Sequence, residues 1–511
     1  MAKSSGPEVT RRTFLGAQAA AAASLAAGTG SGAARKEKPN LLFLWTDEQR
    51  ADTMAAYGNR AIHTPNLNRL ASESSVFRNA YVSQPVCTPS RSTVMTGLWP
   101  HTTGCTENNI ALQPDTRAFP QILSDPDYAT GYFGKWHLGD EVFAQHGFQE
   151  WRSIEDMYRR YYREERDSAE KSSYWHFLRE QGYTPDAGGD FSRGFAARRP
   201  YEHSKPRFLE METCDFLRRH RAEPFALFVN FLEPHMPFYG PFDDEHRLDE
   251  VLVPANLEDP LEANEPESYR TRQAHYREHG WHDLPLETEA HWRRLIANYW
   301  GLVHEVDKAV GGILRTLDEL GLADNTIVVY TSDHGDMMGS HRLLTKCFSY
   351  EESVRVPWLM RIPGVAAQQV AHPVSHIDLM PTLLDVMRAH TDAVLPGRSL
   401  MPLVRGEREP EPVFVEWHPG GGLDKSGPNP AGAIRKPGTP TGSAFRMIVS
   451  PDGWKLTLHT EDHNQLYNLQ DDPGETVNIF GQSQHRERVC ALTQTLHAWQ
   501  QRVDDPIEVN A

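Results

Sequence analysis

The chain has 511 residues, of which 39% are hydrophobic and 24% charged, a composition typical of a globular protein. It carries 52 lysine and arginine residues against 69 aspartate and glutamate residues, a formal net charge of -17. Such a surface repels nucleic-acid phosphates, which excludes a general DNA- or RNA-binding protein. If the substrate is an anion, a local cluster of cations or a metal ion must reverse the sign of the potential at the site.

The first 34 residues have the features of a targeting segment. Arg11 and Arg12 precede an alanine-rich, mildly apolar run that ends near Ala27, and small residues follow to Ala34. This order predicts a signal peptide over residues 1–34 rather than an ordinary alanine-rich helix, and the paired arginines favour the twin-arginine route. We therefore expect an exported protein, periplasmic or extracellular, with the twin-arginine translocase as a partner. The run is too short and too weakly apolar for a stable membrane span, and we expect none elsewhere.

Short apolar runs alternate with helical patterns in residues 38–395. Four runs predict buried parallel strands: Leu41–Trp45, Tyr128–Phe133, Phe225–Phe231 and Thr326–Tyr330. A helical pattern such as Trp292–Leu320 separates them. The alternation predicts an α/β fold with a large, mostly parallel sheet flanked by helices, which we assign to a catalytic domain over residues 38–395.

Residues 396–511 show a different pattern. Turn residues separate four short predicted strands: Val413–Trp417, Phe445–Val449, Lys455–His459 and Gln465–Leu469. Pro419–Gly442 is rich in glycine and proline and is predicted to be a long loop, and a helix is predicted over about Gln484–Val503. We expect a smaller C-terminal subdomain built on an antiparallel sheet.

Polar side chains follow each of the four predicted parallel strands. They are Asp47 and Glu48, Lys135 and His137, His235, and Asp333 and His334. Ligands of open α/β sheets bind beyond the carboxyl ends of the strands. Each residue alone could be a loop residue without a role, but four such ends favour one shared site.

Cys87 begins a segment with its own chemistry. Pro89 suits the first turn of a helix, which places Cys87 at a helix N-terminus. The free N–H groups and the dipole there stabilise a thiolate, a metal-bound oxygen or an oxyanion, and Arg91 adds a permanent cation. The other four cysteines are interpreted as structural, and five cysteines are too few for a disulfide scaffold.

Six motifs occur in a fixed order along the chain. They are Cys87-Thr88-Pro89-Ser90-Arg91 with Thr96-Gly97, Gly134-Lys135-Trp136-His137-Leu138-Gly139, Pro234-His235-Met236-Pro237-Phe238, Ser332-Asp333-His334-Gly335-Asp336, Thr345-Lys346 with Tyr350-Glu351-Glu352, and Leu466-Tyr467-Asn468-Leu469 with Asp472-Pro473. Over roughly residues 38–480 they resemble the signatures of the sulfatases of the alkaline phosphatase superfamily. The chain departs from many relatives at Glu48, where they have aspartate, and at His334, where they have asparagine. The histidine form resembles the branch with choline sulfatases and phosphonate monoester hydrolases.

The resemblance implies a modified cysteine and a metal ion. A formylglycine-generating or other sulfatase-maturing enzyme would oxidise Cys87 to formylglycine. Asp47, Asp333 and His334 would bind one divalent cation together with the oxidised Cys87, and Glu48 is a further candidate ligand. Because carboxylate oxygens dominate this set, Ca²⁺ is expected, with Mg²⁺ or Mn²⁺ as alternatives.

The resemblance also implies catalytic roles for six residues. The hydrated aldehyde at Cys87 would be the nucleophile that attacks sulfur, activated by the metal and Arg91. Lys135 would hold its hydroxyl or a sulfate oxygen, and His137 would be the base that expels sulfate. His235 and Lys346 would protonate or stabilise the leaving alkoxide.

We expect hydrolysis of sulfate esters, with sulfated carbohydrates as natural substrates and aryl sulfates as surrogates. Trp417 and His418 precede the long predicted loop, which carries Lys425, Arg435 and Lys436, and such aromatic and cationic side chains suit sugar faces and neighbouring sulfates. The alternatives on the same site are a phosphonate monoester hydrolase or phosphodiesterase and a choline sulfatase. An inactive exported binding protein with unconverted Cys87 is an alternative of another class.

Overall fold

The computed structural model describes residues 38–282, 284–418 and 443–511. The predicted signal peptide and the predicted loop Pro419–Gly442, with its three cations, lie outside the described residues. Asn40–Ala511 form one compact unit. Within the described residues, no helix is long and apolar enough to cross a bilayer.

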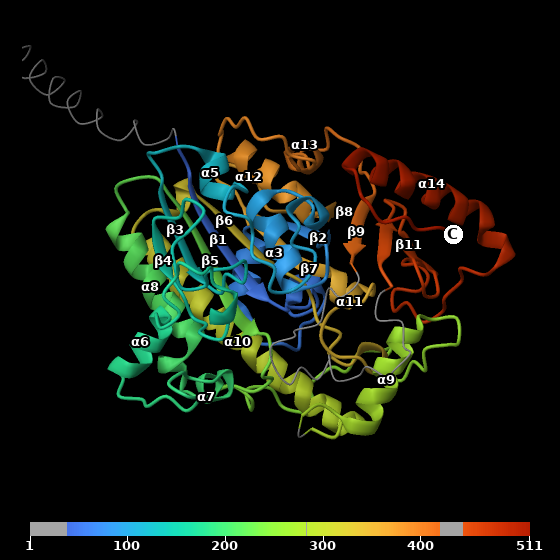
Figure 1. Ribbon diagram of the computed structural model, residues 1–511, viewed down its shortest axis with the longest axis horizontal. Helices are drawn as coiled ribbons and strands as arrows, with labels where there is room; N and C mark the ends of the chain where they lie inside the picture. The colour runs from blue at the N-terminus through green and yellow to red at the C-terminus, as the bar shows by residue number, and fades with distance from the viewer. Residues whose placement is uncertain (1–37, 283, 419–442) are drawn as a thin grey trace, which may run out of the picture. The chain divides into compact units, whose positions relative to one another are not determined.

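The main sheet has eight strands in the order β4-β3-β5-β1-β6-β7-β2-β8 (Figure 1). Their bounds are β1 Asn40–Asp47, β2 Ser75–Tyr81, β3 Ala129–Gly134, β4 Glu150–Arg152, β5 Phe225–Pro234, β6 Thr326–Ser332, β7 Arg355–Arg361 and β8 Gln368–Ser375. All neighbours pair in parallel except β7, which is antiparallel to β6 and to β2. The predicted large and mostly parallel sheet is confirmed.

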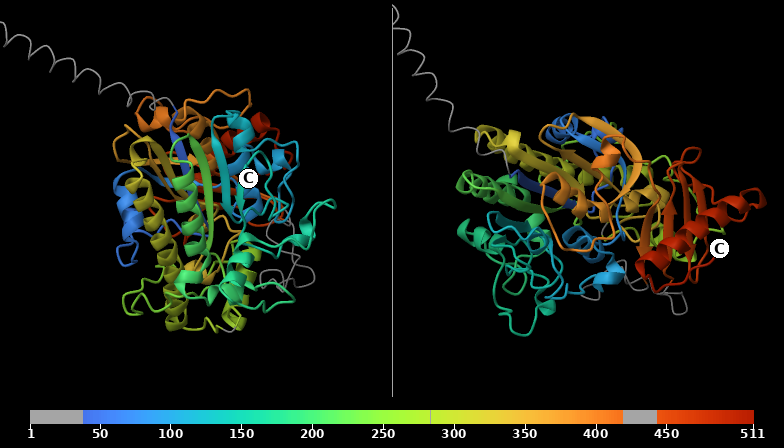
Figure 2. Two further views of the ribbon diagram at one scale, coloured as in Figure 1. Left: turned by 90° about the vertical axis from the view of Figure 1, so that its left-hand side faces the viewer. Right: turned by 90° about the horizontal axis from the view of Figure 1, so that it is seen from above.

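Helices cover both faces of this sheet (Figures 1 and 2). The α-helices of the described residues are α2 Pro65–Ser72, α3 Cys87–Thr96, α4 Pro100–Thr103, α5 Phe119–Leu123, α6 Ser173–Glu180, α7 Arg193–Ala197, α8 Lys205–Arg219, α9 Glu267–His279, α10 Glu289–Glu319, α11 Glu351–Val354, α12 Leu379–Val386, α13 Met401–Val404 and α14 Arg486–Val503. The predicted long helix corresponds to α10.

The apolar run of β1 explains why two layers of helices are needed. Its side chains alternate between the faces, as a period of two requires. Leu41, Phe43 and Trp45 join a buried cluster with α3, α5 and α12. Leu42 and Leu44 join a second cluster with α2, α8 and α10. A strand that is apolar on both faces must be covered on both, and this is the arrangement of a central parallel strand.

The strands that carry the predicted site residues are contiguous. The order β3-β5-β1-β6 is parallel throughout, so their carboxyl ends lie on one edge. The register brings Asp47 of β1 opposite Pro234 of β5, and Thr46 opposite Ser332 of β6. The residues at and directly after the ends of these strands therefore lie together at the carboxyl edge of the sheet, as the sequence predicts.

A second, four-stranded antiparallel sheet lies near the C-terminus, in the order β12-β11-β10-β9 (Figure 2). Its strands are β9 Val413–Trp417, β10 Phe445–Val449, β11 Trp454–His459 and β12 Gln465–Asn468, close to the predicted bounds. Ile448 and Leu456 pack with Leu496 and Trp499 of α14. On its other face, Val415 and Met447 pack with Tyr81 of β2 and Val354 of α11.

Candidate active site

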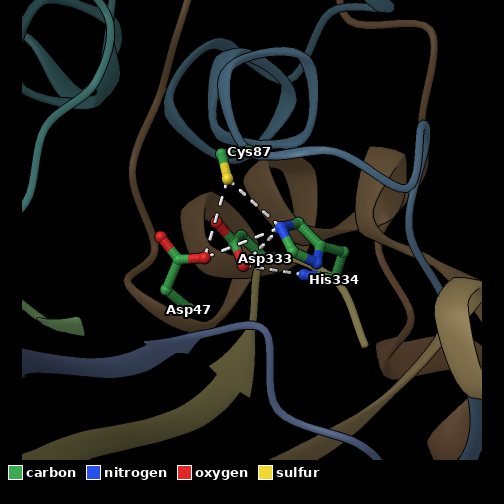
Figure 3. Close-up of side chains that lie close together, drawn as sticks. All are labelled: Asp47, Cys87, Asp333 and His334. Atoms are coloured by element: carbon green, nitrogen blue, oxygen red, sulfur yellow. Dashed lines mark hydrogen bonds and ion pairs between the residues drawn. The ribbon is translucent and has the colours of Figure 1, made fainter. Parts of the chain in front are cut away.

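Four side chains converge at the carboxyl edge of the main sheet (Figure 3). One ligand atom from each of Asp47, Cys87, Asp333 and His334 lies within 4.8 Å of the others, and all four residues are buried. The Cys87 sulfur lies 3.6 Å from Asp47 Oδ1 and 3.3 Å from His334 Nε2. Two carboxylates, an imidazole and a sulfur in this arrangement form a set of ligands for a divalent cation.

Arg91 orients both carboxylates. Its guanidinium donates from Nε to Asp333 Oδ2 and from Nη2 to Asp47 Oδ2, both at 2.9 Å. Asn230 and the Lys135 carbonyl accept from Nη1, and the guanidinium lies over the Trp45 ring. The Oδ2 atoms are thus occupied by Arg91, while both Oδ1 atoms lie within 3.6 Å of His334 Nε2. Arg91 therefore acts on the carboxylates rather than on Cys87 directly.

The tautomer of His334 is set by its neighbour. Its Nδ1 lies 2.9 Å from the Gly335 carbonyl, which can only accept, so Nδ1 carries the proton. Nε2 then presents a lone pair to the cluster. Metal-ligating histidines use this arrangement, because a hydrogen bond on one ring nitrogen orients the other.

Cys87 is the first residue of α3, as predicted, and α3 ends at a left-handed Gly97. Its thiol is buried, and burial together with Asp47 raises the pKa of Cys87 to about 11. Of the three species that this helix N-terminus was expected to stabilise, the thiolate is therefore not favoured at neutral pH. The cause is desolvation beside a carboxylate, which outweighs the helix dipole and the nearby lysines.

Lys135 and Lys346 bring positive charge to the same place. Lys135 Nζ donates to Asp47 Oδ2 and lies 3.8 Å from the Cys87 sulfur. Lys346 Nζ lies 3.2 Å from that sulfur and 3.0 Å from Glu48 Oε2. Burial opposes charge on Lys346, but Cys87, Glu48 and Asp47 outweigh it and raise its pKa well above the usual value. Both lysines are therefore ammonium ions, and they place positive charge beside Cys87 next to the carboxylates with which they pair.

Glu48 lies beside the cluster in a left-handed backbone conformation, with φ 69°. Its Oε2 contacts Lys346 and lies 3.3 Å from His235 Nε2, while its buried Oε1 has no hydrogen-bond partner. Burial raises the pKa of Glu48 to about 8 and lowers that of His235 well below its usual value. A free buried carboxylate oxygen next to Asp47 is available to a cation.

His137 is one contact further from Cys87. Thr88, the neighbour of Cys87, donates its hydroxyl to the His137 carbonyl at 2.8 Å. Asn109 Oδ1 lies 2.9 Å from His137 Nε2, which assigns the proton to Nε2 and leaves the buried Nδ1 as an unpartnered lone pair. Burial and Lys135 lower the pKa of His137 well below its usual value. A neutral imidazole with a free lone pair is suited to accept a proton.

Three further histidines have partners outside this cluster. His101 pairs with Glu416, His304 contacts the His63 carbonyl, and His376 contacts the Thr331 hydroxyl. Asp378 accepts the Arg398 N–H. Gln49, a weaker ligand candidate, uses its amide on Thr46, Thr53 and Tyr330 and so holds β1 to β6.

Comparisons with known proteins identify the family of the chain. The sulfatase family model matches residues 39–389, which is more than half of the chain. The chain belongs to the sulfatase family. Its members are sulfuric ester hydrolases, so the predicted enzyme class and the family resemblance are confirmed.

Several characterised relatives resemble this sulfatase over nearly their whole length. An N-acetylglucosamine-6-O-sulfatase from Bacteroides thetaiotaomicron is 26% identical, over 95% of this chain and 90% of its own. A choline-sulfatase from Rhizobium meliloti is 29% identical, over 86% and 82%. The solved structure of a phosphonate monoester hydrolase from Silicibacter pomeroyi has a TM-score of 0.75, with 24% identity and coverage of 91% and 96%. The last comparison supports the fold.

The sequence did not single out several residues that hold this sulfatase site together. Glu141 accepts the backbone N–H groups of Trp136 and His137 and fixes the turn after β3. Asp336 accepts the Thr345 N–H and so positions the segment before Lys346. Asn109, in a loop with no strand or helix pattern, fixes the tautomer of His137. Glu141 and Asp336 lie inside or next to matched motifs, which is the one signal that could have marked them.

Proposed function

We propose that this sulfatase hydrolyses sulfate esters of carbohydrates, with formylglycine made from Cys87 and one divalent cation, and that Ca²⁺ is the ion. The observation that carries the proposal is the position of the Cys87 sulfur. It lies within 3.8 Å of Asp47, His334, Lys135 and Lys346 at the start of α3. A helix N-terminus, two ammonium groups and the predicted ligands together surround an anion such as sulfate.

The ligand set fits a hard cation. Asp47 and Asp333 would bind through the Oδ1 atoms that Arg91 leaves free, His334 through Nε2, and Glu48 through its unpartnered Oε1. Three carboxylates and one imidazole suit Ca²⁺, and also Mg²⁺ or Mn²⁺. When bound, the ion and the aldehyde hydrate at position 87 supply the nucleophilic oxygen and neutralise charge on the sulfuryl group.

The remaining residues move protons and hold charge. Lys135 and Lys346, both charged, hold sulfate oxygens. Neutral His137 accepts a proton at Nδ1, the atom that Asn109 leaves free. His235 directs Nε2 at Glu48 because the Met236 carbonyl holds its Nδ1 proton. On this side of the site Lys346, which is charged, is the group that gives its proton to the leaving alkoxide, and Glu48 and His235 lie beside it.

A carbohydrate substrate is supported by the named sugar sulfatase among the relatives. His334 favours the second candidate, a choline sulfate or phosphonate monoester, because it resembles the residue of that branch. Trp417 offers less to a sugar than expected, because its ring stacks on Phe445 at 6.0 Å.

The first experiment is a mass spectrum of the peptide that contains Cys87. We expect the mass loss of thiol-to-aldehyde conversion, and a fully unmodified thiol in an inactive protein would support the exported binding protein instead. The second is kcat/KM on sulfated mono- and oligosaccharides, an aryl sulfate, choline sulfate and a phosphonate monoester. We expect the sugars to rank first. If choline sulfate or the phosphonate ranks first and the sugars are not hydrolysed, the carbohydrate proposal is wrong.

A further inference from the structure

A second group of potential metal ligands lies outside the active site. His63 directly precedes Thr64, the N-cap residue of α2, Glu245 lies in the segment between β5 and α9, and His304 lies on α10. One ligand atom from each lies within 4.8 Å of the others. No predicted catalytic role uses any of them.

The hydrogen bond that His304 makes through one ring nitrogen turns the other ring nitrogen toward a carboxylate. Its Nδ1 lies 2.8 Å from the His63 carbonyl, which can only accept, so Nδ1 carries the proton. Nε2 lies 3.8 Å from Glu245 Oε1, too far for a hydrogen bond, and the His304 side chain is only 7% exposed. Nε2 and Glu245 Oε1 therefore do not satisfy one another directly, and the gap between them is one that a cation bound to both atoms would fill.

His63 completes the group from the solvent side. Its ring stacks on that of His304, with centroids 4.9 Å apart and an angle of 21° between the planes. Its Nδ1 lies 2.7 Å from Glu245 Oε1, and its side chain is 57% exposed, which gives an ion a path of entry. His246 accepts the His63 backbone N–H at 3.0 Å and holds this segment in place.

We propose that His63, Glu245 and His304 bind one Zn²⁺ ion, with water completing the coordination. Two imidazoles and one carboxylate are a known zinc ligand set, and tetrahedral coordination places ligand atoms roughly 3.3 Å apart. The two contacts of Glu245 Oε1, at 2.7 and 3.8 Å, lie on either side of this value. Zn²⁺ displaces the proton from His63 Nδ1, and that proton is released to solvent.

The backbone carbonyl of His63 orients the His304 ring by a hydrogen bond. It accepts the Nδ1 proton of His304, so a ligand segment orients the other imidazole ligand. The same arrangement orients His334 in the active site through the Gly335 carbonyl. Glu245 and His304 follow His63 by 182 and 241 residues in the chain, so bound zinc would join three distant segments. The site therefore acts on stability rather than on catalysis.

The test uses a full-length background, Cys87→Ala with Asp333→Ala, which weakens metal binding at the active site. Zn²⁺ is titrated calorimetrically into this background and into versions that also carry His304→Gln or His63→Gln. We expect each glutamine variant to lose at least about tenfold in zinc affinity at one site. Zinc should also raise the melting temperature of the background but not of these variants. His390→Gln, at an exposed histidine after α12, is the control and should bind zinc as the background does.

X-ray absorption at the zinc edge gives a second readout, and two imidazole ligands are expected in the background protein. Because His63 is largely exposed, His63→Gln keeps the test valid even if His304→Gln disturbs α10. Equal zinc affinity and equal thermal shift in the background and in both variants would overturn the proposal. None of these readouts depends on sulfate-ester hydrolysis, so they remain informative whatever the substrate proves to be.

Discussion

At the scale of single residues, Cys87 is the position on which the proposed chemistry depends. Its sulfur is buried among two lysines, a carboxylate and an imidazole, and its thiol stays protonated at neutral pH. An unmodified thiol here is a weak nucleophile, because the thiolate is the reactive form. We therefore expect the position to gain its reactivity from the proposed conversion of the side chain.

We predict that Cys87→Ala abolishes turnover and leaves the fold intact, because α3 and its contacts remain. Turnover of an aryl sulfate and a far-ultraviolet circular dichroism spectrum are the measurements. Cys105→Ala is the matched control, because Cys105 is equally buried in the core under α3 and should leave turnover in place. Normal activity in Cys87→Ala would end the proposed mechanism.

We predict that Asp333→Ala loses the divalent ion and lowers kcat by at least about 10³-fold, because ion and nucleophile act as a unit. The change also removes one of the two carboxylates that pair with the buried Arg91, so stability falls as well. Elemental analysis, kcat and the melting temperature test this. Asp392→Ala, at an exposed partner of Arg117, is the control. Full activity of the wild-type enzyme after exhaustive chelation, with no metal found, would contradict the metal site.

At the scale of secondary-structure elements, one histidine joins three of them. His101 in α4 contacts Glu416 of β9 through Nδ1 and its backbone N–H, and Nε2 lies 3.0 Å from the Val503 carbonyl at the end of α14. With a carboxylate on one ring nitrogen and a carbonyl on the other, both ring nitrogens donate, which describes the charged imidazolium. Burial opposes this charge, but Glu416 outweighs it and raises the pKa of His101.

The raised pKa gives a pH-dependent prediction. A histidine whose folded-state pKa exceeds its unfolded value, about 6.5, stabilises fully below that value and loses the effect as pH rises through the folded pKa. We therefore expect His101→Gln to lower the free energy of unfolding by about 1.5–3 kcal/mol at pH 5.5 and by less at pH 9. Denaturant unfolding at the two pH values measures the difference, with His390→Gln as control. A difference that is the same at both pH values would show that His101 is neutral.

At the scale of the whole molecule, the net charge is negative, whereas several cations are buried together in the candidate active site. The chain carries a formal net charge of -17, yet its site contains Arg91, Lys135 and Lys346. The acidic exterior does not help to attract a sulfate ester, so we expect binding to depend on these buried cations and on the proposed ion. Asp47, Asp333 and Glu48 pair with the three cations, so the proposed divalent ion would supply the excess of positive charge.

We predict that replacing Arg11 and Arg12 together by lysine retains the protein in the cytoplasm, because the paired arginines are the signal of the twin-arginine route. Immunoblots of cytoplasmic and exported fractions measure the distribution. Arg35→Lys, beyond the predicted signal peptide, is the control and should be exported normally. Normal export of the double variant would refute this route.

The sequence by itself determined the layers of the fold and the family. The continuous apolar run Leu41–Trp45 requires burial on both faces, and the polar residues after four such runs lie at one edge because parallel strands end together. These signals are local, since period and turn chemistry are contained in a few neighbouring residues. Motif order then supplied the family, which the comparisons confirm.

Only the tertiary structure decided the protonation and the partners of individual side chains. Which oxygen of Asp47 faces Arg91, which nitrogen of His137 is free, and why the Cys87 thiol keeps its proton depend on burial and on residues far away in the sequence. The group His63, Glu245 and His304 has no sequence motif at all, because its members come from three separate segments. Electrostatic energies depend on distance and desolvation in three dimensions, and a sequence contains neither until it is folded.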